Sequence, residues 1–401
     1  MDDGRRELPK PPRRIPAGAS PTVAPAARTT IQPRPNAAAQ TTKPPKPPRF
    51  RFLIPLIVFV LVIGAGAGWL VRAYSLSLDT DKVLQASGPT VVRVLATTCN
   101  GTGQASGLLL ANGRVITTAS AIRQPVSIGI LTADGRVRRA NVLGVNANGI
   151  AVLQLLSRLD NPTAKLALKL PDAKADRAII GYNQAGDQSV EQAGTALQPR
   201  ALRDILDPGS LGAPMFDKGG QVIGLVAGET VASSKVIGLD ELRQYAGPAA
   251  LPITPEPLGT CLARGPQAPV KPDLSVANTP LAGEVQQVLG DYLDALNRHD
   301  YLAMQATYSA QLAANGTEKD FANTHGTSYA FDATITDVAA GAADGATARM
   351  TFTVLFSPKS TGANGQTCSR LDLRYRLVRE QDRLRIDQAA SMATDQSCDT
   401  D

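Results

Sequence analysis

Residues 106–122 read SGLLLANGRVITTASAI, two apolar runs joined by the Asn-Gly pair at 112–113. Such a pair accepts the positive φ angles of a tight hairpin turn, and the Asp-Gly pair at 134–135 stands in the same way between apolar runs. Short runs of this kind recur over residues 83–247 with no helical period between them, apart from one helix expected at 240–245. The pattern predicts an all-β barrel or sandwich.

Three turns in this region carry the residues that matter for chemistry. They read TTASAI at 117–122, GIAVL at 149–153 and GSLGAPM at 209–215. These turns resemble, in order, the segments T-x-A-H-V-V, D-[IL]-A-V-L and G-x-S-G-G-P-L of trypsin-like serine proteases, closest to the high-temperature-requirement and membrane-anchored types. The resemblance covers residues 83–247 and implies the chymotrypsin fold, an all-β double barrel.

The catalytic residues of that family are replaced in this chain. Ser120, Gly149 and Leu211 stand where the family has His, Asp and Ser. A hydroxyl cannot take a proton at neutral pH as an imidazole with a pKa near 6.5 can. The only two histidines, His299 and His325, fall outside this region. We therefore expect a pseudoprotease, a catalytically inactive homologue rather than an enzyme.

An active serine endopeptidase with non-standard catalytic residues is the alternative. Ser210 stands one position before the usual nucleophile, and Asn146 or Asn148 would replace the orienting carboxylate. The base of a Ser–Lys dyad would be one of three lysines: Lys165, Lys169 or Lys174.

The turn and strand around 209–228 are retained although the catalytic residues are not. In active members of the family the strand after this turn pairs with substrate backbone, so the degenerate cleft is expected to bind an extended peptide by strand addition. The residues expected to form this binding site are Gly209, Ser210, Gly212, Gly224 and Gly228. A structural role explains the same glycines, because they permit close backbone approach. The favoured function is binding or scaffolding of a peptide, protein or cell-wall partner.

A membrane segment precedes the β-rich region. Residues 52–71 read FLIPLIVFVLVIGAGAGWLV, twenty residues without a charge, which at 1.5 Å each span about 30 Å as a helix. We expect a transmembrane helix at 52–73, because the run is longer than the apolar core of a cleaved signal peptide. Four basic residues lie within 43–51, so the N-terminus is expected to be cytoplasmic and the rest of the chain extracytoplasmic.

The N-terminal tail, residues 1–50, is basic and holds twelve prolines. Such a segment buries too little apolar surface to order, so a disordered cytoplasmic tail is expected. The formal charge of the chain is +6, and the basic excess lies on this tail rather than on one face of a folded domain. This distribution argues against nucleic-acid binding.

The four cysteines all follow the membrane segment, where disulfides persist. Cys99 stands near the start of the protease-like region and Cys261 just beyond its end, while Cys368 and Cys398 bracket a hairpin near the C-terminus. We expect the pairs Cys99–Cys261 and Cys368–Cys398, with unpaired reactive thiols as the alternative. No Cys-x-x-Cys motif or His cluster is present, so neither a metal nor a cofactor is expected.

The remainder of the chain differs in composition from the β-rich region. Residues 248–280 hold eight prolines without periodicity and are expected to form a linker. In 281–401, Val285, Leu289, Tyr292 and Leu296 follow helical spacing, and alternating strands come after them.

This order of helices and then strands, with the helix break LNRHDYLAM at 296–304, resembles the nuclear-transport-factor-two-like, cystatin-like α+β cone. The resemblance implies a pocket inside the cone. His299 and Asp300 are expected to cap helices at the break, with an acid–base pair of His325 and Asp332 as the minor alternative. The arginines at 370, 374, 376 and 379 are expected to form a solvated face.

Overall fold

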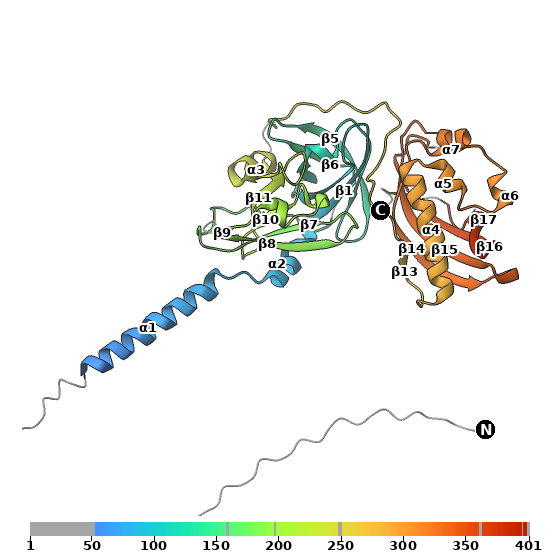
Figure 1. Cartoon of the computed structure of the whole chain (residues 1–401). Helices are drawn as coiled ribbons and strands as arrows, with labels where there is room; N and C mark the ends of the chain where they lie inside the picture. The colour runs from blue at the N-terminus through green and yellow to red at the C-terminus, as the bar shows by residue number, and fades with distance from the viewer. Residues whose placement is uncertain are drawn as a thin grey trace, which may run out of the picture. The chain divides into compact units, whose positions relative to one another are not determined.

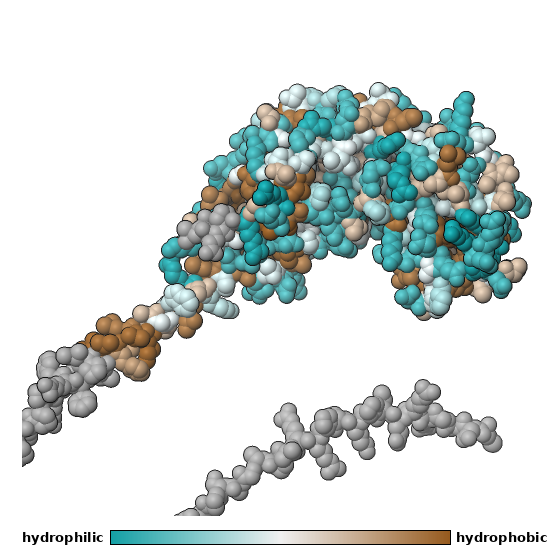
Figure 2. Space-filling model, viewed as in Figure 1, coloured by the Kyte–Doolittle hydropathy of each residue, from teal (hydrophilic) through white to brown (hydrophobic). Residues whose placement is uncertain are grey.

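The computed structural model describes residues 53–157, 160–195, 198–247, 251–360, 363–394 and 396–398. The tail expected at residues 1–50 lies outside the described residues. Helix α1 (Leu53–Leu76) is the one described helix that is long and apolar enough to cross a membrane, over Ile57–Tyr74. Within residues 57–74 its large apolar side chains are more than half exposed, and Figure 2 shows a brown stretch along this helix. A helix that is apolar and exposed on all sides requires a bilayer or a partner, which agrees with the predicted anchor.

A closed six-stranded barrel follows in the order β1-β2-β3-β6-β5-β4 (Figure 1). Its strands are β1 (Val91–Thr98), β2 (Gln104–Leu109), β3 (Arg114–Thr118), β4 (Pro125–Leu131), β5 (Val137–Val145) and β6 (Ile150–Leu155). Helix α2 (Thr80–Ser87) precedes the barrel, although the sequence analysis expects only strands from Val83. The helix forms because the Asp79 side chain accepts a hydrogen bond from the Lys82 N–H and caps the first turn.

The second half is a six-stranded sheet in the order β12-β11-β10-β7-β8-β9. Its strands are β7 (Arg177–Tyr182), β8 (Gln188–Thr195), β9 (Gln198–Pro199), β10 (Pro214–Phe216), β11 (Val222–Ala227) and β12 (Lys235–Gly238). Within the described residues its end strands do not pair with each other, so it is an open sheet rather than the second closed barrel that the resemblance implies. The end strands have only four and two residues, too few to close a ring of hydrogen bonds. Helix α3 (Leu239–Ala246) confirms the predicted helix and buries Leu242 and Tyr245.

The expected turn at the Asp-Gly pair 134–135 joins β4 to β5, with Gly135 at φ +73°. The Asp134 carboxylate accepts hydrogen bonds from the guanidinium of Arg138 at 2.8 and 3.1 Å and from the Thr132 hydroxyl at 2.5 Å. Arg138 is only 4% exposed, so this carboxylate balances a buried charge. Burial by itself raises the pKa of Asp134, but the hydrogen bonds outweigh it and lower the pKa to about 2.

Asp134→Asn is expected to lower the free energy of unfolding at pH 7 by about 2 kcal/mol. The shift from 3.8 to about 2 corresponds to roughly 2.4 kcal/mol, and solvent at the partly exposed carboxylate screens some of it. Because the folded-state pKa is depressed, this stabilisation is complete above pH 4 and disappears as the pH falls towards 2. Urea unfolding of the full chain in micelles at pH 7 and pH 2.5 measures both effects. The control is Asp240→Asn, which removes an exposed ion pair with Arg243; equal losses from the two variants would contradict the prediction.

The linker lies against the barrel instead of running free. Thr254 forms an antiparallel bridge with Val145, and Arg264 forms another with Thr98. Between them the Gly259 N–H donates to the Pro125 carbonyl at 2.9 Å. We call residues 251–268 the strap.

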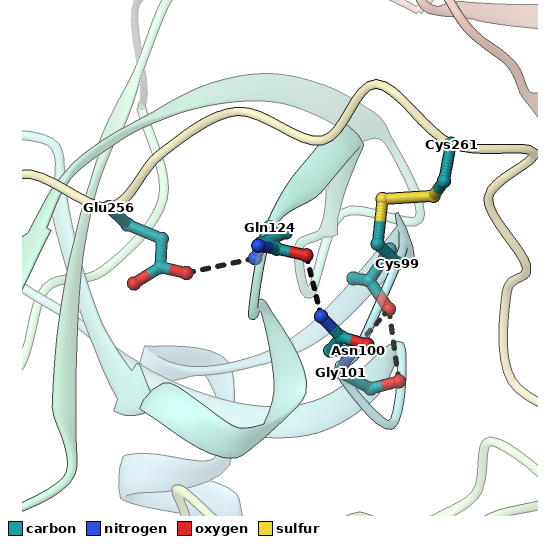
Figure 3. Close-up of a disulfide and its surroundings, with 7 residues drawn as sticks. Cys99, Asn100, Gly101, Gln124, Glu256 and Cys261 are labelled. Atoms are coloured by element: carbon teal, nitrogen blue, oxygen red, sulfur yellow. Dashed lines mark hydrogen bonds between the residues drawn. A yellow bond between two sulfur atoms is a disulfide. The ribbon is translucent and has the colours of Figure 1, made fainter.

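The Cys99–Cys261 disulfide fastens the strap near its middle (Figure 3). Next to it, the Glu256 carboxylate accepts a hydrogen bond from the Gln124 N–H at 2.9 Å. The second disulfide joins Cys368 to Cys398. Both predicted pairings are therefore confirmed.

The C-terminal part places helices before a curved sheet, in the predicted order (Figure 1). The helices are α4 (Pro280–Arg298), α5 (Tyr301–Gln305), α6 (Ala310–Ala313) and α7 (Glu318–His325). The sheet has the order β13-β14-β15-β16-β17. Its strands are β13 (Asp273–Leu274), β14 (Tyr329–Ala340), β15 (Ala346–Leu355), β16 (Cys368–Glu380) and β17 (Arg383–Ser391). A short strand, β18 (Gln396–Ser397), also pairs with β16. Helix α4 buries Val285, Leu289 and Leu296 against the sheet. The cystatin-like assignment remains a prediction.

Candidate functional site

The structure brings the three degenerate motif turns together where the barrel meets the second sheet. Ser120 lies in a short 3₁₀ turn, Ala119–Ala121, after β3, and the Ala119 N–H donates to the Gly149 carbonyl at 2.8 Å. Leu211 follows the 3₁₀ turn Pro208–Ser210, and its carbonyl accepts from the Ser106 N–H of β2 at 2.8 Å. The scaffold that would hold a catalytic triad is therefore present.

The Ser120 hydroxyl, at the position where the family has its catalytic base, is hydrogen-bonded to a backbone carbonyl. Ser120 is 4% exposed, and its Oγ donates to the Gly228 carbonyl at 2.8 Å. The Thr118 hydroxyl lies 3.2 Å from Ser120 Oγ, donates to the same carbonyl at 3.0 Å and accepts from the Gly228 N–H at 3.3 Å. Both backbone groups of Gly228, which follows β11, are thus occupied by side chains from the end of β3.

The turn that would form an oxyanion hole is closed on itself. In trypsin-like enzymes the N–H of the nucleophile and the N–H two residues earlier stabilise the oxyanion. The equivalent groups here are engaged internally: Gly209 N–H donates to the Asp207 carboxylate at 2.8 Å, and Leu211 N–H donates to the Pro208 carbonyl at 3.3 Å. In this conformation neither N–H is free to bind a substrate carbonyl.

The residues of the alternative catalytic site, with Ser210 as its nucleophile, do not form a catalytic group in the structure. Ser210 is 2% exposed, and its Oγ donates to the Tyr182 carbonyl at 3.2 Å. Asn146 does not approach a base but donates to Glu241 at 2.7 Å and to the Tyr245 hydroxyl at 2.6 Å, which fixes α3. The three candidate lysines, Lys165, Lys169 and Lys174, are exposed.

The glycines of the expected binding site serve close packing. A Cβ on Gly212, at φ +85°, would lie 2.1 Å from the Ser106 carbonyl oxygen, and a Cβ on Gly209 would lie 2.8 Å from the Tyr182 carbonyl oxygen. Gly224 pairs with Met215 on one side and Gly238 on the other, so β11 is a central strand at this point. Strand addition along Gly224 is therefore blocked.

A cavity of about 390 Å³ lies beside these turns. Its walls come from the β1–β2 connection, the turn 208–211, the loop after β11 and the strap. The lining residues are Thr102, Gln104, Gln184, Pro208, Gly209, Leu211, Glu229, Thr230, Val231, Ala232, Pro266, Gln267 and Ala268. Most of these residues are missed by sequence reasoning, because only the fold brings the loop 229–232 and the strap to the motif turns.

Residues 105–225 match the family model of the trypsin-like peptidase domain. We refer to residues 80–247 as the β-rich region. Two curated relatives, serine protease MT3772 of Mycobacterium tuberculosis strain CDC 1551 / Oshkosh and serine protease Rv3671c of strain ATCC 25618 / H37Rv, are each 22% identical over 204 residues. These matches cover 46% of the chain and 51% of each relative, so the chain spans about half the length of the curated relatives it matches.

Solved structures of one relative also match part of the chain. The inactive form of the Rv3671c protease is 21% identical, with a TM-score of 0.33, and the match covers 40% of this chain and 89% of that one. The active form of the protease from M. tuberculosis is 20% identical, with a TM-score of 0.36, over 43% of this chain and 86% of that one.

These relatives contradict the expectation that the chain is not an enzyme. Both curated relatives are named serine proteases, and the matching family model is that of a peptidase domain. The expectation of a non-enzyme is therefore wrong. It equated the replacement of three motif residues with the loss of activity, although a serine hydroxyl is present beside the nucleophile position.

His299 and Asp300 have the capping geometry that was expected. His299 ends α4 at φ 56° and stacks on Tyr301, while the Asp300 carboxylate caps α5 by accepting from the Ala303 N–H at 3.0 Å. Burial lowers the pKa of His299 and of His325. Burial raises the pKa of Asp332, and the charges of Arg370 and Arg93 oppose this rise.

The arginine face is partly neutralised. Arg376 forms an ion pair with Asp387, and Arg379 forms one with Glu284. These ion pairs reduce the net positive charge of this face, and therefore its attraction for an anionic cell-wall partner.

Proposed function

We propose that this chain is a membrane-anchored serine peptidase whose peptidase domain lies outside the cytoplasm and acts on an extended polypeptide through non-standard catalytic residues. The observation that carries the proposal is the cavity beside the turn 208–211, because this turn, which holds the motif of the family nucleophile, lines it together with an extended segment of the chain itself. The bridges at Thr254 and Arg264 show that extended backbone is accommodated against this barrel.

The location supports a substrate outside the cytoplasm. Helix α1 is apolar and exposed, basic residues cluster on its N-terminal side in the sequence, and both disulfides lie after it. Disulfides persist in oxidising compartments, and a basic flank stays in the cytoplasm. We infer a cytoplasmic N-terminus, with the peptidase domain and the C-terminal part on the other side.

The nucleophile in this proposal is the hydroxyl of Ser210 or the hydroxyl of Ser120. For attack, Ser210 must give up its hydrogen bond to the Tyr182 carbonyl, or Ser120 its hydrogen bond to the Gly228 carbonyl. The N–H groups of Gly209 and Leu211 must also leave their internal acceptors to receive the oxyanion. Substrate binding would therefore have to rearrange the turn 207–212.

A fluorophosphonate probe on the full chain in micelles tests the assignment. We expect covalent labelling that maps to Ser210 or Ser120, and at least a tenfold loss of labelling when the mapped serine is replaced by alanine. Ser275→Ala, at an exposed position outside the cavity, is the control and should label as the parent chain does. The absence of both labelling and cleavage of a peptide library would overturn the peptidase proposal.

A further inference from the structure

The C-terminal part holds a second cavity that the peptidase proposal does not use. It has a volume of about 260 Å³ and is lined by residues of the sheet and of the helical segments that pack on it. Its lining residues are Tyr292, Tyr308, Leu312, Asn315, Phe321, Tyr375, Ile386 and Ala389. Among these described residues none carries a charge, so the cavity favours an uncharged ligand.

The floor of the cavity is set by the register of three strands. Tyr375 of β16 is directly opposite Ala348 of β15 and Ala389 of β17, so the three side chains share one face of the sheet. The tyrosine ring stands between two alanines, and the small side chain of Ala389 leaves open space at the mouth. Ala389 is exposed, whereas Tyr375 is only 1% exposed.

The walls are aromatic and held in place by backbone. The ring centroid of Tyr308 lies 6.0 Å from that of Tyr292 and 5.9 Å from that of Phe321. The segment that carries Tyr308 is fixed to β17, because the Ser309 N–H donates to the Ile386 carbonyl at 2.8 Å and the Ile386 N–H donates to the Thr307 carbonyl at 2.9 Å. The site is therefore preformed, as ligand pockets usually are.

One polar group in the cavity lacks a partner. The Tyr375 hydroxyl is buried, and no described residue forms a hydrogen bond with it. By contrast, Tyr292 and Tyr308 share a hydrogen bond with each other. Buried hydroxyls in folded proteins are normally paired, so an unpaired one that lines a cavity points to a ligand. Burial holds the pKa of Tyr375 far above its usual range, so the hydroxyl stays neutral and can donate a hydrogen bond to a ligand acceptor.

We propose that this cavity binds a small, neutral, ring-containing molecule with one hydroxyl or carbonyl group, which accepts a hydrogen bond from Tyr375. Aromatic walls favour a flat ring system by stacking and edge contacts. The absence of a lining cation among the described residues disfavours carboxylates and phosphates. The volume limits the ligand to about two fused rings, since drug-sized ligands occupy sites of roughly 300–1,000 Å³.

The test uses 2-naphthol and 2-methylnaphthalene, two probes of the same shape that differ in the hydroxyl. Each is titrated into the full chain in nanodiscs, and binding is followed by the methyl NMR signals of Leu312 and Ile386. We expect saturable shifts with both probes and tighter binding of 2-naphthol. Tyr375→Phe should weaken 2-naphthol binding about fivefold, the loss expected for one hydrogen bond, and leave 2-methylnaphthalene binding within twofold.

Two further variants keep the test decisive. Ala389→Trp fills the exposed mouth and should abolish the shifts with both probes, while Tyr301→Phe changes a buried tyrosine outside the cavity and should alter neither affinity. Probe that dissolves in the lipid lowers the free concentration equally for all variants. The proposal is overturned if neither probe shifts these methyl signals at saturation, if Ala389→Trp binds normally, or if Tyr375→Phe weakens both probes equally.

Discussion

Replacement of both Cys99 and Cys261 by serine is expected to destabilise the folded β-rich region by about 5 kcal/mol. The bond closes a loop of 162 residues, and in the chain-entropy model the stabilisation grows with the logarithm of loop length. The same model gives about 3.5 kcal/mol for the Cys368–Cys398 bond, which closes a loop of 30 residues. Cys261 is exposed and Cys99 is half-buried, so the serines bury little new polar surface and the loss comes from the missing crosslink.

The loss should be concentrated in the strap. Without the bond the strap is held by single bridges at Thr254 and Arg264 and by the hydrogen bonds of Gly259 and Glu256. Hydrogen exchange at these amides is expected to accelerate at least tenfold, while exchange in the β14–β15 pair stays unchanged. Thermal unfolding and hydrogen exchange of the full chain measure the two effects. A double variant that unfolds within 1 kcal/mol of the parent chain would show that the strap is held without the bond.

The parts of the fold that rest on local sequence signals were predictable. The Asn-Gly and Asp-Gly hairpin turns, the α3 and α4 helices and the two disulfides all agree with the structure, because each depends on residues near in sequence or on a small number of possible pairings. The short helix at Thr80–Ser87 was missed, since its Asp79 cap is a weak signal beside an apolar run. The open second sheet was also missed, because closure depends on strand lengths that the alternation pattern does not set.

The candidate site was predictable only in its motif positions. Ser120, Gly149 and Leu211 were located from sequence, and the structure gathers their three turns. The groups that contact these turns come from residues far away in sequence. Ser120 is hydrogen-bonded to the Gly228 carbonyl and Ser210 to the Tyr182 carbonyl, and the strap residues Pro266–Ala268 form part of the cavity wall. These contacts join residues about 30 to 160 positions apart, and no local pattern encodes them.

Replacement of Gly212 by alanine is expected to cost more than about 3 kcal/mol of folding stability, which is near the upper end for a single substitution. The residue has φ +85°, and its added Cβ would lie 2.1 Å from the Ser106 carbonyl oxygen and 2.6 Å from Thr117 Oγ1. That carbonyl also accepts the Thr117 hydroxyl at 2.6 Å, so the clash breaks the contact that joins β2 and β3 to the motif turn.

Gly149 provides a matched control because its φ is also +85° but no atom lies within 4 Å of its Cβ position. Gly149→Ala is therefore expected to lose about 1 kcal/mol of folding stability, the cost of the left-handed backbone alone. The difference between the two variants, measured by urea unfolding of the full chain, isolates the close approach of Gly212 to β2. If the turn 207–212 has to rearrange during peptide cleavage, Gly212→Ala should also abolish fluorophosphonate labelling under conditions where the variant is still folded. Equal losses of stability in Gly212→Ala and Gly149→Ala would mean that the turn already shifts freely, and the closed oxyanion site would then be a weakly held state.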